Sequence, residues 1–244
     1  MNIALLGYGK MGRTIEALAV SAGHKIVFKN TSKTSEGHLN DADVAIEFST
    51  PSAAPNNLRL CFEAKIPAVC GTTAWLEYWD DTVALCEQHQ GALVYASNFS
   101  VGVQLFYELQ RQMAQIMNRH PEYNISIEER HHVQKKDAPS GTAIRLAEIL
   151  IDSTRYDQWV LGPAKIQNEL PIEAIREPET PGIHKVTYQG KIDQISLEHQ
   201  AHSREGFAFG ALLAADWLIG KTGIFSMKEV LHLSDNKHDQ NTAS

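Results

Sequence analysis

The sequence has few cysteines, and they lack the spacing of a metal site. Cys61, Cys70 and Cys86 are the only three in 244 residues. An odd number with this spacing fits neither a zinc motif nor a paired disulfide framework. The N-terminus shows no export signal and begins as a strand entering a turn, so we expect reduced, structural cysteines. The expected location is therefore cytoplasmic.

Long apolar runs and basic clusters are also missing. The longest apolar candidate, residues 207–220, is too short to span a bilayer and contains Asp216. The formal net charge is −7, from 22 Lys and Arg against 29 Asp and Glu. Because contacts to phosphate backbones need clustered basic residues, neither nucleic acid nor a membrane is expected as a partner. A local pocket for a small anion remains compatible with this charge.

The first hundred residues alternate apolar strands with helical patterns. Thr50-Pro51 is expected to be a helix N-cap followed by proline at the first helical position. Regular alternation of this kind predicts the α/β class, a Rossmann-type doubly wound parallel sheet. The expected strands are residues 2–7, 24–30, 42–49, 67–73 and 92–98.

After Asn98 the pattern changes to that of a second, α+β domain. A capping box from Ser226 to Glu229 lies within a stretch, 207–233, that reads as helical. We expect a dinucleotide-binding domain of residues 1–99 and 207–238, a second domain of residues 100–206, and a frayed tail at 239–244. Within the second domain the expected elements are a helix at 100–119, a strand at 123–129, a helix after Pro139, a polar loop at 161–181 and an antiparallel hairpin at 184–201.

A glycine-rich turn, Gly7-x-Gly9-x-x-Gly12, follows the first strand and opens the first helix. Gly7 permits the tight turn, Gly9 lets the backbone approach a pyrophosphate, and Gly12 lets the helix pack on the sheet. Helix amides then face the phosphates. The motif predicts binding of NADPH or NADH, and the alternative is a glycine turn without a ligand.

The ends of the later strands bear on which dinucleotide binds and where. An acidic residue after the second strand would hold the ribose 2′-hydroxyl, but Lys29 is followed by no acid before Glu36. This favours NADPH being used at least as well as NADH, unless Lys29 is only solvated. The other strand ends carry candidate cofactor contacts or helix caps: Phe48, Ser49, Gly71, Thr72, Thr73, Asn98 and Phe99.

The stretch 128–143, EERHHVQKKDAPSGTA, places titratable groups directly before a helix. His131 and His132 would point to opposite faces of a strand, so we expect them to do different jobs. The amides and hydroxyls of residues 140–142, at the helix N-terminus, form a good carboxylate site, although Ser140 could be an N-cap only. No metal is expected, because adjacent histidines diverge and no third ligand has suitable spacing.

This stretch resembles the signature of the 4-hydroxy-tetrahydrodipicolinate reductase (dihydrodipicolinate reductase) family. The resemblance extends to GYGKMGR, EFSTP, CGTT, SNFSVGVQLF and HSREGFAFGA, nearly the whole chain in the family's order. It implies an NAD(P)H-dependent reductase of lysine and diaminopimelate biosynthesis that acts on a small dicarboxylate and is usually a homotetramer. Residues 100–206 would then serve for both substrate binding and oligomerisation.

The resemblance also implies residue roles. His131 would be the general acid and Lys135 its cationic companion, while His132, Ser140, Gly141 and Thr142 would bind the substrate carboxylates. The implied cofactor contacts are Gly7, Lys10, Met11, Phe48, Gly71, Thr73, Asn98 and Phe99. The chain departs from the family where Ala74 replaces a usual glycine and where the loop before the hairpin is short.

Two other functions remain as alternatives. The N-terminal half would also suit another two-domain NAD(P) oxidoreductase, such as a homoserine- or sugar-type dehydrogenase, although the His-His-Lys stretch beside a carboxylate site argues against it. A nucleotide-sensing regulator would need a DNA- or protein-binding appendage, and the sequence has no basic helix for one.

Overall fold

The computed structural model describes residues 1–31 and 33–233. They form two compact units, each with its own sheet. The first unit holds residues 1–101 together with the described residues from Glu205 onward, and the second holds Gly102–Arg204. The expected tail at 239–244, and residues 234–238 of the expected first domain, lie outside the described residues.

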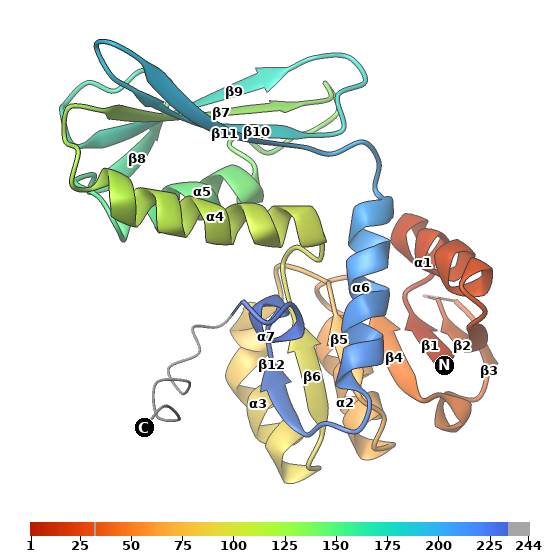
Figure 1. The fold of residues 1–244 in the computed structure, drawn as a ribbon. Helices are drawn as coiled ribbons and strands as arrows, with labels where there is room; N and C mark the ends of the chain where they lie inside the picture. Colours follow the sequence, from red (N-terminus) through yellow and green to blue (C-terminus); the bar gives the residue numbers. More distant parts are fainter. Residues whose placement is uncertain (32, 234–244) are drawn as a thin grey trace, which may run out of the picture. The chain divides into compact units, whose positions relative to one another are not determined.

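The first unit is built on a seven-stranded sheet with the order β12-β6-β5-β4-β1-β2-β3. Every neighbouring pair is parallel except β2 and β3 (Figure 1). This confirms the predicted Rossmann-type sheet. Its strands are β1 (Asn2–Leu6), β2 (Lys25–Asn30), β3 (Ser35–Gly37), β4 (Val44–Glu47), β5 (Ala68–Cys70), β6 (Ala92–Tyr95) and β12 (Gly223–Phe225).

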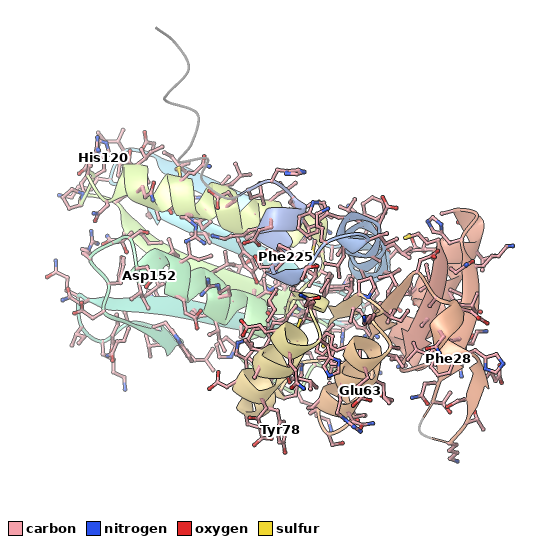
Figure 2. The ribbon with its side chains drawn as sticks, turned by 90° about the horizontal axis from the view of Figure 1, so that it is seen from below. Phe28, Glu63, Tyr78, His120, Asp152 and Phe225 are labelled. Carbon is pink, nitrogen blue, oxygen red and sulfur yellow. The ribbon has the colours of Figure 1, made fainter. Side chains whose placement is uncertain are left out.

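Helices cover both faces of this sheet because its strands are apolar on both sides. Ile3 and Leu5 of β1 pack with α1 (Lys10–Ser21), α6 (Glu205–Leu218) and α7 (Met227–Val230), whereas Ala4 and Leu6 pack with α2 (Ala54–Glu63) and α3 (Trp79–Gln88). Figure 2 shows α2, which ends at Glu63, beside α3, which follows Tyr78. The three cysteines are free and buried in this second core, which agrees with their expected structural role.

Three predictions for the first unit were wrong. Thr50 does not cap α2: its carbonyl accepts hydrogen bonds from the amides of Ala53 and Ala54, so a turn precedes the helix. The proline near the helix start is Pro55, whose missing N–H costs nothing in the first turn. The stretch 207–233 is not helical throughout, since β12 interrupts it. The strands β3 and β12 were missed because three residues are too few to show an alternating pattern.

The second unit is a five-stranded sheet with the order β11-β10-β7-β9-β8. Two helices, α4 (Val101–Met117) and α5 (Gly141–Ile151), cover one face and share its apolar core (Figure 1). The predicted hairpin is confirmed as the antiparallel pair β10 and β11. The strands are β7 (Asn124–His131), β8 (Gln158–Leu161), β9 (Glu169–Arg176), β10 (Ile183–Gln189) and β11 (Gln194–Gln200).

The predicted loop at 161–181 was also wrong, because the whole of β9 lies within it. Leu170 and Ile172 alternate toward the core and are fully buried, whereas the prolines and glutamates of the segment had suggested a loop. Pro171 is tolerated in the strand because it lies in the part of β9 that pairs with β8 only. Among the described helices, none is both long and apolar enough to cross a bilayer.

Candidate active site

The glycine-rich turn joins β1 to α1 in the way its spacing predicts. Gly7 has a φ of +98°, and a Cβ at this position would lie 2.1 Å from the Phe48 carbonyl oxygen. A Cβ at Gly12 would lie 2.4 Å from the Gly7 carbonyl oxygen. Both glycines are therefore required by packing within the protein. Gly9 differs, since a Cβ there would contact nothing within 4 Å.

Gly9 is also the N-cap of α1, and no side chain caps the helix. The first turn of α1 carries no acidic residue, so the amides and the positive end of the helix dipole are available to an anion. The open space over Gly9 matches what a pyrophosphate needs for close approach to the backbone. The residues present therefore fit a dinucleotide.

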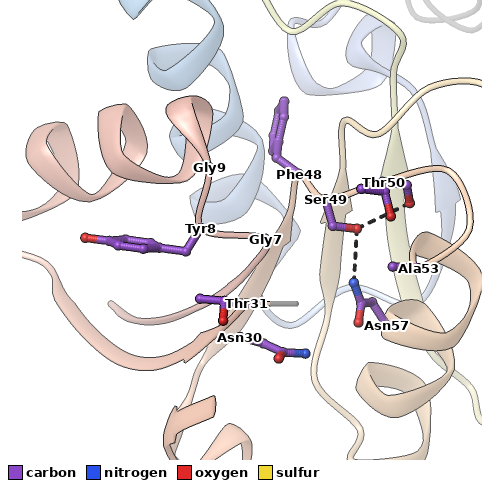
Figure 3. A pocket seen from close by; sticks show the side chains of 10 residues that line it. All are labelled: Gly7, Tyr8, Gly9, Asn30, Thr31, Phe48, Ser49, Thr50, Ala53 and Asn57. Carbon is purple, nitrogen blue, oxygen red and sulfur yellow. Dashed lines mark hydrogen bonds between the residues drawn. The ribbon is translucent and has the colours of Figure 1, made fainter. Parts of the chain in front are cut away.

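A pocket of about 320 Å³ adjoins this turn at the carboxyl ends of β1, β2 and β4 (Figure 3). Of the predicted cofactor residues, Gly7, Gly9, Phe48 and Ser49 line it. Six further lining residues were not predicted: Tyr8, Asn30, Thr31, Thr50, Ala53 and Asn57. None of the ten side chains that line the pocket carries a formal charge.

Several other predicted cofactor residues lie behind the pocket lining and support it. A Cβ at Gly71 would lie 2.2 Å from an atom of the Phe48 ring. The centres of the Phe48 and Phe99 rings are 5.8 Å apart. The Thr72 hydroxyl accepts a hydrogen bond of 2.8 Å from the Ser49 amide. Gly71, Phe99 and Thr72 thus fix Phe48 and Ser49. The remaining predicted cofactor residues, also outside the lining, are Lys10, Met11, Gly12, Lys29, Thr73 and Asn98.

Lys29 is held by the protein itself. Its ammonium lies 2.5 Å from a carboxylate oxygen of Glu16 and 4.9 Å from the centre of the Tyr8 ring. The Tyr8 hydroxyl donates a hydrogen bond to the same carboxylate. The bond to Glu16 raises the pKa of Lys29, which keeps the ammonium charged. At the end of β2 the pocket is lined by Asn30 and Thr31, and Lys29 is not among its lining residues.

A buried carboxylate that sequence reasoning missed lies beneath the pocket. Glu47, at the end of β4, is fully buried and accepts hydrogen bonds from the Ser49 hydroxyl, the Asn57 amide at 3.2 Å and the Cys70 thiol at 3.2 Å. Burial, followed by the nearby Glu47 charge, raises the pKa of Cys70 well above its usual value, so the thiol stays protonated. Glu47 therefore orients two side chains of the pocket lining, Ser49 and Asn57.

The second unit gathers its titratable groups at one end of its sheet. In β7 the buried positions alternate, so Ile125, Ile127, Glu129 and His131 share a face. The face changes from apolar to ionic where the strand approaches the start of α5. Strand register brings His184 of β10 opposite Glu129 and Arg176 of β9 opposite His131.

Glu129 is the centre of this group. Its Oε1 accepts hydrogen bonds from Arg176 at 3.0 Å and from the Ser140 amide at 3.1 Å, and its Oε2 lies 3.0 Å from His131 Nδ1. Burial raises the pKa of Glu129, but these contacts outweigh burial and bring that pKa to about 2. The carboxylate is therefore ionised. Burial and then the His131 charge lower the pKa of His184 to about 3, so His184 is neutral.

Strand register brings a third ligand-type group to Glu129 and His131 that sequence spacing did not indicate. Ligand-type atoms of Glu129, His131 and His184 lie within 4.8 Å of one another. The third group comes from a distant strand, so local spacing could not reveal it. Because the Arg176 guanidinium already occupies one oxygen of Glu129, the contacts describe an ion-pair network, and we do not assign a metal to it.

The start of α5 is already partly engaged. The Ser140 hydroxyl accepts a hydrogen bond of 3.2 Å from the Ala143 amide and lies 3.1 Å from His184 Nε2, while the Ser140 amide donates to Glu129. Ser140 is therefore an N-cap, which its position had left open beside the expected role in carboxylate binding. Gly141 is the first helical residue, so its amide has no carbonyl partner within the helix. A Cβ at Gly141 would contact nothing within 4 Å, which leaves room for an anion.

The two other predicted site residues lie in the turn between β7 and α5. His132 is half-buried just beyond the end of β7. The Lys135 ammonium pairs with Asp137, with N–O distances of 2.8 and 2.9 Å. Lys135 is close enough to His184 for its charge to contribute to the lowered pKa of that imidazole. Two cationic or titratable side chains thus flank the helix start.

Replacing Ser140 by alanine is expected to have two effects. Loss of the cap should cost about 1 kcal/mol of stability, and the Michaelis constant for an anionic substrate should rise because the first turn of α5 loses its fixed geometry. Thermal unfolding and steady-state kinetics measure the two effects separately. A lower melting temperature with an unchanged Michaelis constant would leave Ser140 with a capping role only.

Comparison with known proteins shows the family of this chain. The profile for the N-terminal part of dihydrodipicolinate reductase matches residues 1–99, and the profile for the C-terminal part matches residues 102–231. The chain belongs to the dihydrodipicolinate reductase family. Members of this family are oxidoreductases that use NADH or NADPH, in keeping with the pocket at the glycine-rich turn.

Individual family members show the same relation along nearly the whole chain. The 4-hydroxy-tetrahydrodipicolinate reductase of Christiangramia forsetii is 50% identical over 234 residues, covering 95% of this chain and 98% of the relative. That of Lawsonia intracellularis is 32% identical, covering 95% and 99%. The dipicolinate-bound dihydrodipicolinate reductase of Paenisporosarcina sp. TG-14 has a TM-score of 0.72 at 21% identity, covering 93% of this chain and 97% of that one, and shares the fold.

Proposed function

We propose that this protein catalyses the NAD(P)H-dependent reduction of 4-hydroxy-tetrahydrodipicolinate to tetrahydrodipicolinate in the diaminopimelate route to lysine. The observation that carries the proposal is the placement of His131, a buried imidazole paired with an ionised carboxylate, at the same end of the sheet as the start of α5. A proton donor and an anion site are thus supplied by one stretch of chain.

Each candidate residue has a definite task in this reaction. The amides of Gly141 and Thr142, with Ser140 and His132, bind the substrate carboxylates. When bound, the reduced nicotinamide supplies a hydride to the ring of the substrate. His131 delivers the proton to the adjacent ring carbon as general acid, and the Lys135 ammonium stabilises the electron density that develops there.

The cofactor is held by the first unit. Gly7, Gly9 and Gly12, with Lys10 and Met11 at the start of α1, would hold the pyrophosphate. Phe48 and Ser49 line the pocket, and Gly71, Thr72, Thr73, Asn98 and Phe99 complete its surroundings. Because uncharged Asn30 and Thr31 line the pocket after β2, we propose that NADPH and NADH are both used. Lys29 makes no direct contact with the cofactor in this proposal, because its ammonium is paired with Glu16.

The direct test is an assay with purified protein, NADPH and the condensation product of pyruvate and aspartate semialdehyde. We expect NADPH to be oxidised only when both carbonyl compounds have been supplied, and initial rates with NADH to be measurable under the same conditions. Absence of turnover with both cofactors would contradict the proposed function. Oxidation without the semialdehyde would indicate a different dehydrogenase.

Assembly and location complete the proposal. We propose that the protein is a homotetramer in the cytoplasm and that the second unit forms the interface between subunits. The proposed substrate is a small dicarboxylate. Light scattering after size-exclusion chromatography measures the mass directly. A monomeric mass at the enzyme concentration used in the assay would contradict the tetramer without affecting the proposed reaction.

A further inference from the structure

Glu129 has the features of a group that controls His131. It lies two residues before His131 on the same face of β7, and it is fully buried. Carboxylates are rarely buried completely unless they are paired. Its partners come from three places outside β7, namely Arg176 on β9, His184 on β10 and the Ser140 amide before α5.

The two oxygens of Glu129 are used differently. Oε1 accepts the hydrogen bonds from Arg176 and from the Ser140 amide. Oε2 faces the two imidazoles, 3.0 Å from His131 Nδ1 and 3.8 Å from His184 Nε2. Arg176 and the amide therefore fix the carboxylate in place. Oε2 accepts no hydrogen bond from the described residues, and its contact with the nearer imidazole is an ion pair by distance.

We propose that Glu129 is a positioning residue that orients His131 and keeps its imidazole protonated for proton transfer. The inference rests on the proposed reductase function. Because Nδ1 is the ring nitrogen on the Glu129 side, in an ion-pair contact of 3.0 Å with Oε2, the proton to be donated is the one on Nε2. Transfer of this proton to the substrate carbon leaves a neutral imidazole whose remaining N–H, on Nδ1, faces the carboxylate, and solvent then returns the proton to Nε2.

The surroundings of His131 support this assignment. Gly182 leaves the Nε2 side of the ring uncrowded, since a Cβ there would stand 3.1 Å from Nε2. His184 meets the His131 ring edge-on, with ring centres 5.0 Å apart, and is neutral, so it does not neutralise Glu129. The other charges nearby are Arg176, fixed on Oε1, and Lys135, paired with Asp137. Glu129 is thus the carboxylate paired with His131.

Glu129→Gln removes the charge and keeps the shape. We expect the alkaline limb of the kcat/KM profile to move to lower pH by about one unit or more, because a carboxylate next to an imidazole favours its charged form. The matched control is Glu128→Gln: this neighbour lies on the opposite face of β7 and pairs with Arg130, so its limb should not move. A lower melting temperature with an unmoved limb in Glu129→Gln would overturn the inference.

A second variant and a second measurement make the test independent of folding and of turnover. Glu129→Asp keeps the charge but moves it farther from His131 Nδ1. The alkaline limb of its kcat/KM profile should therefore shift to lower pH by less than in Glu129→Gln. An alkaline limb and a kcat equal to those of the wild type would overturn the inference. NMR titration of His131, assigned from its absence in His131→Ala, needs no activity. If His131 titrates with the same midpoint in the wild type and in Glu129→Gln, the positioning role of Glu129 is contradicted, even when the wild-type enzyme shows turnover. If the wild type shows no turnover, the proposed function fails instead.

Discussion

Replacing His131 by alanine is expected to lower kcat by about 10²-fold or more, the usual contribution of a general acid. The same scale is expected for Lys135→Ala, because the ammonium stabilises charge that develops only during reduction. Affinity for NADPH should be largely kept, since none of the ten residues lining the cofactor pocket belongs to the second unit. Steady-state kinetics and a fluorescence titration with NADPH measure the two quantities.

Matched controls are available for both positions. His120 is an exposed histidine that pairs only loosely with Glu122, and Lys136 is the exposed neighbour of Lys135. His120→Ala and Lys136→Ala should keep near-normal turnover. If His131→Ala and Lys135→Ala did so as well, the proton donor and its companion would have to be sought elsewhere in the chain.

Local sequence patterns predicted those features that depend on neighbours in the chain. The glycine spacing placed the turn between β1 and α1, because Gly12 meets the Gly7 carbonyl oxygen within that same turn. The position of Ser140 before an apolar helix pattern allowed for its cap as an alternative, and the predicted capping box of Ser226 and Glu229 is confirmed. In each case the contact spans only a few residues.

Features that depend on which strands pair, and in which register, could not be predicted from local sequence patterns. Glu129 reads as one acid among several in its stretch, and nothing near it indicates that β9 and β10 bring Arg176 and His184 to it. The same holds for Lys29, which seemed available for a phosphate until α1 brought Glu16 within reach of its ammonium. Glu47 gave no signal for the same reason, since Asn57 and Cys70 reach it from α2 and β5.

The second large effect is expected at the glycine-rich turn. Gly9→Ala should weaken NADPH binding by roughly 10- to 100-fold, which corresponds to losing a charge-assisted hydrogen bond to phosphate worth about 1.5–3 kcal/mol. The added methyl group would occupy the space through which the pyrophosphate approaches the amides of α1. Calorimetric titration with NADPH measures the loss.

The argument for Gly9 depends on separating ligand binding from folding. A Cβ at Gly9 contacts nothing within 4 Å, and its φ of −85° is negative, so alanine meets no clash and the melting temperature should fall much less than in Gly7→Ala. Gly7→Ala is the contrasting variant: its φ of +98° and the clash with the Phe48 carbonyl should lower stability and binding together. Of the three glycines in the turn, Gly9 alone has no protein atom near its Cβ position. Unchanged NADPH affinity in Gly9→Ala would therefore mean that the pyrophosphate does not lie over the start of α1. The pocket beside it would then bind some other ligand.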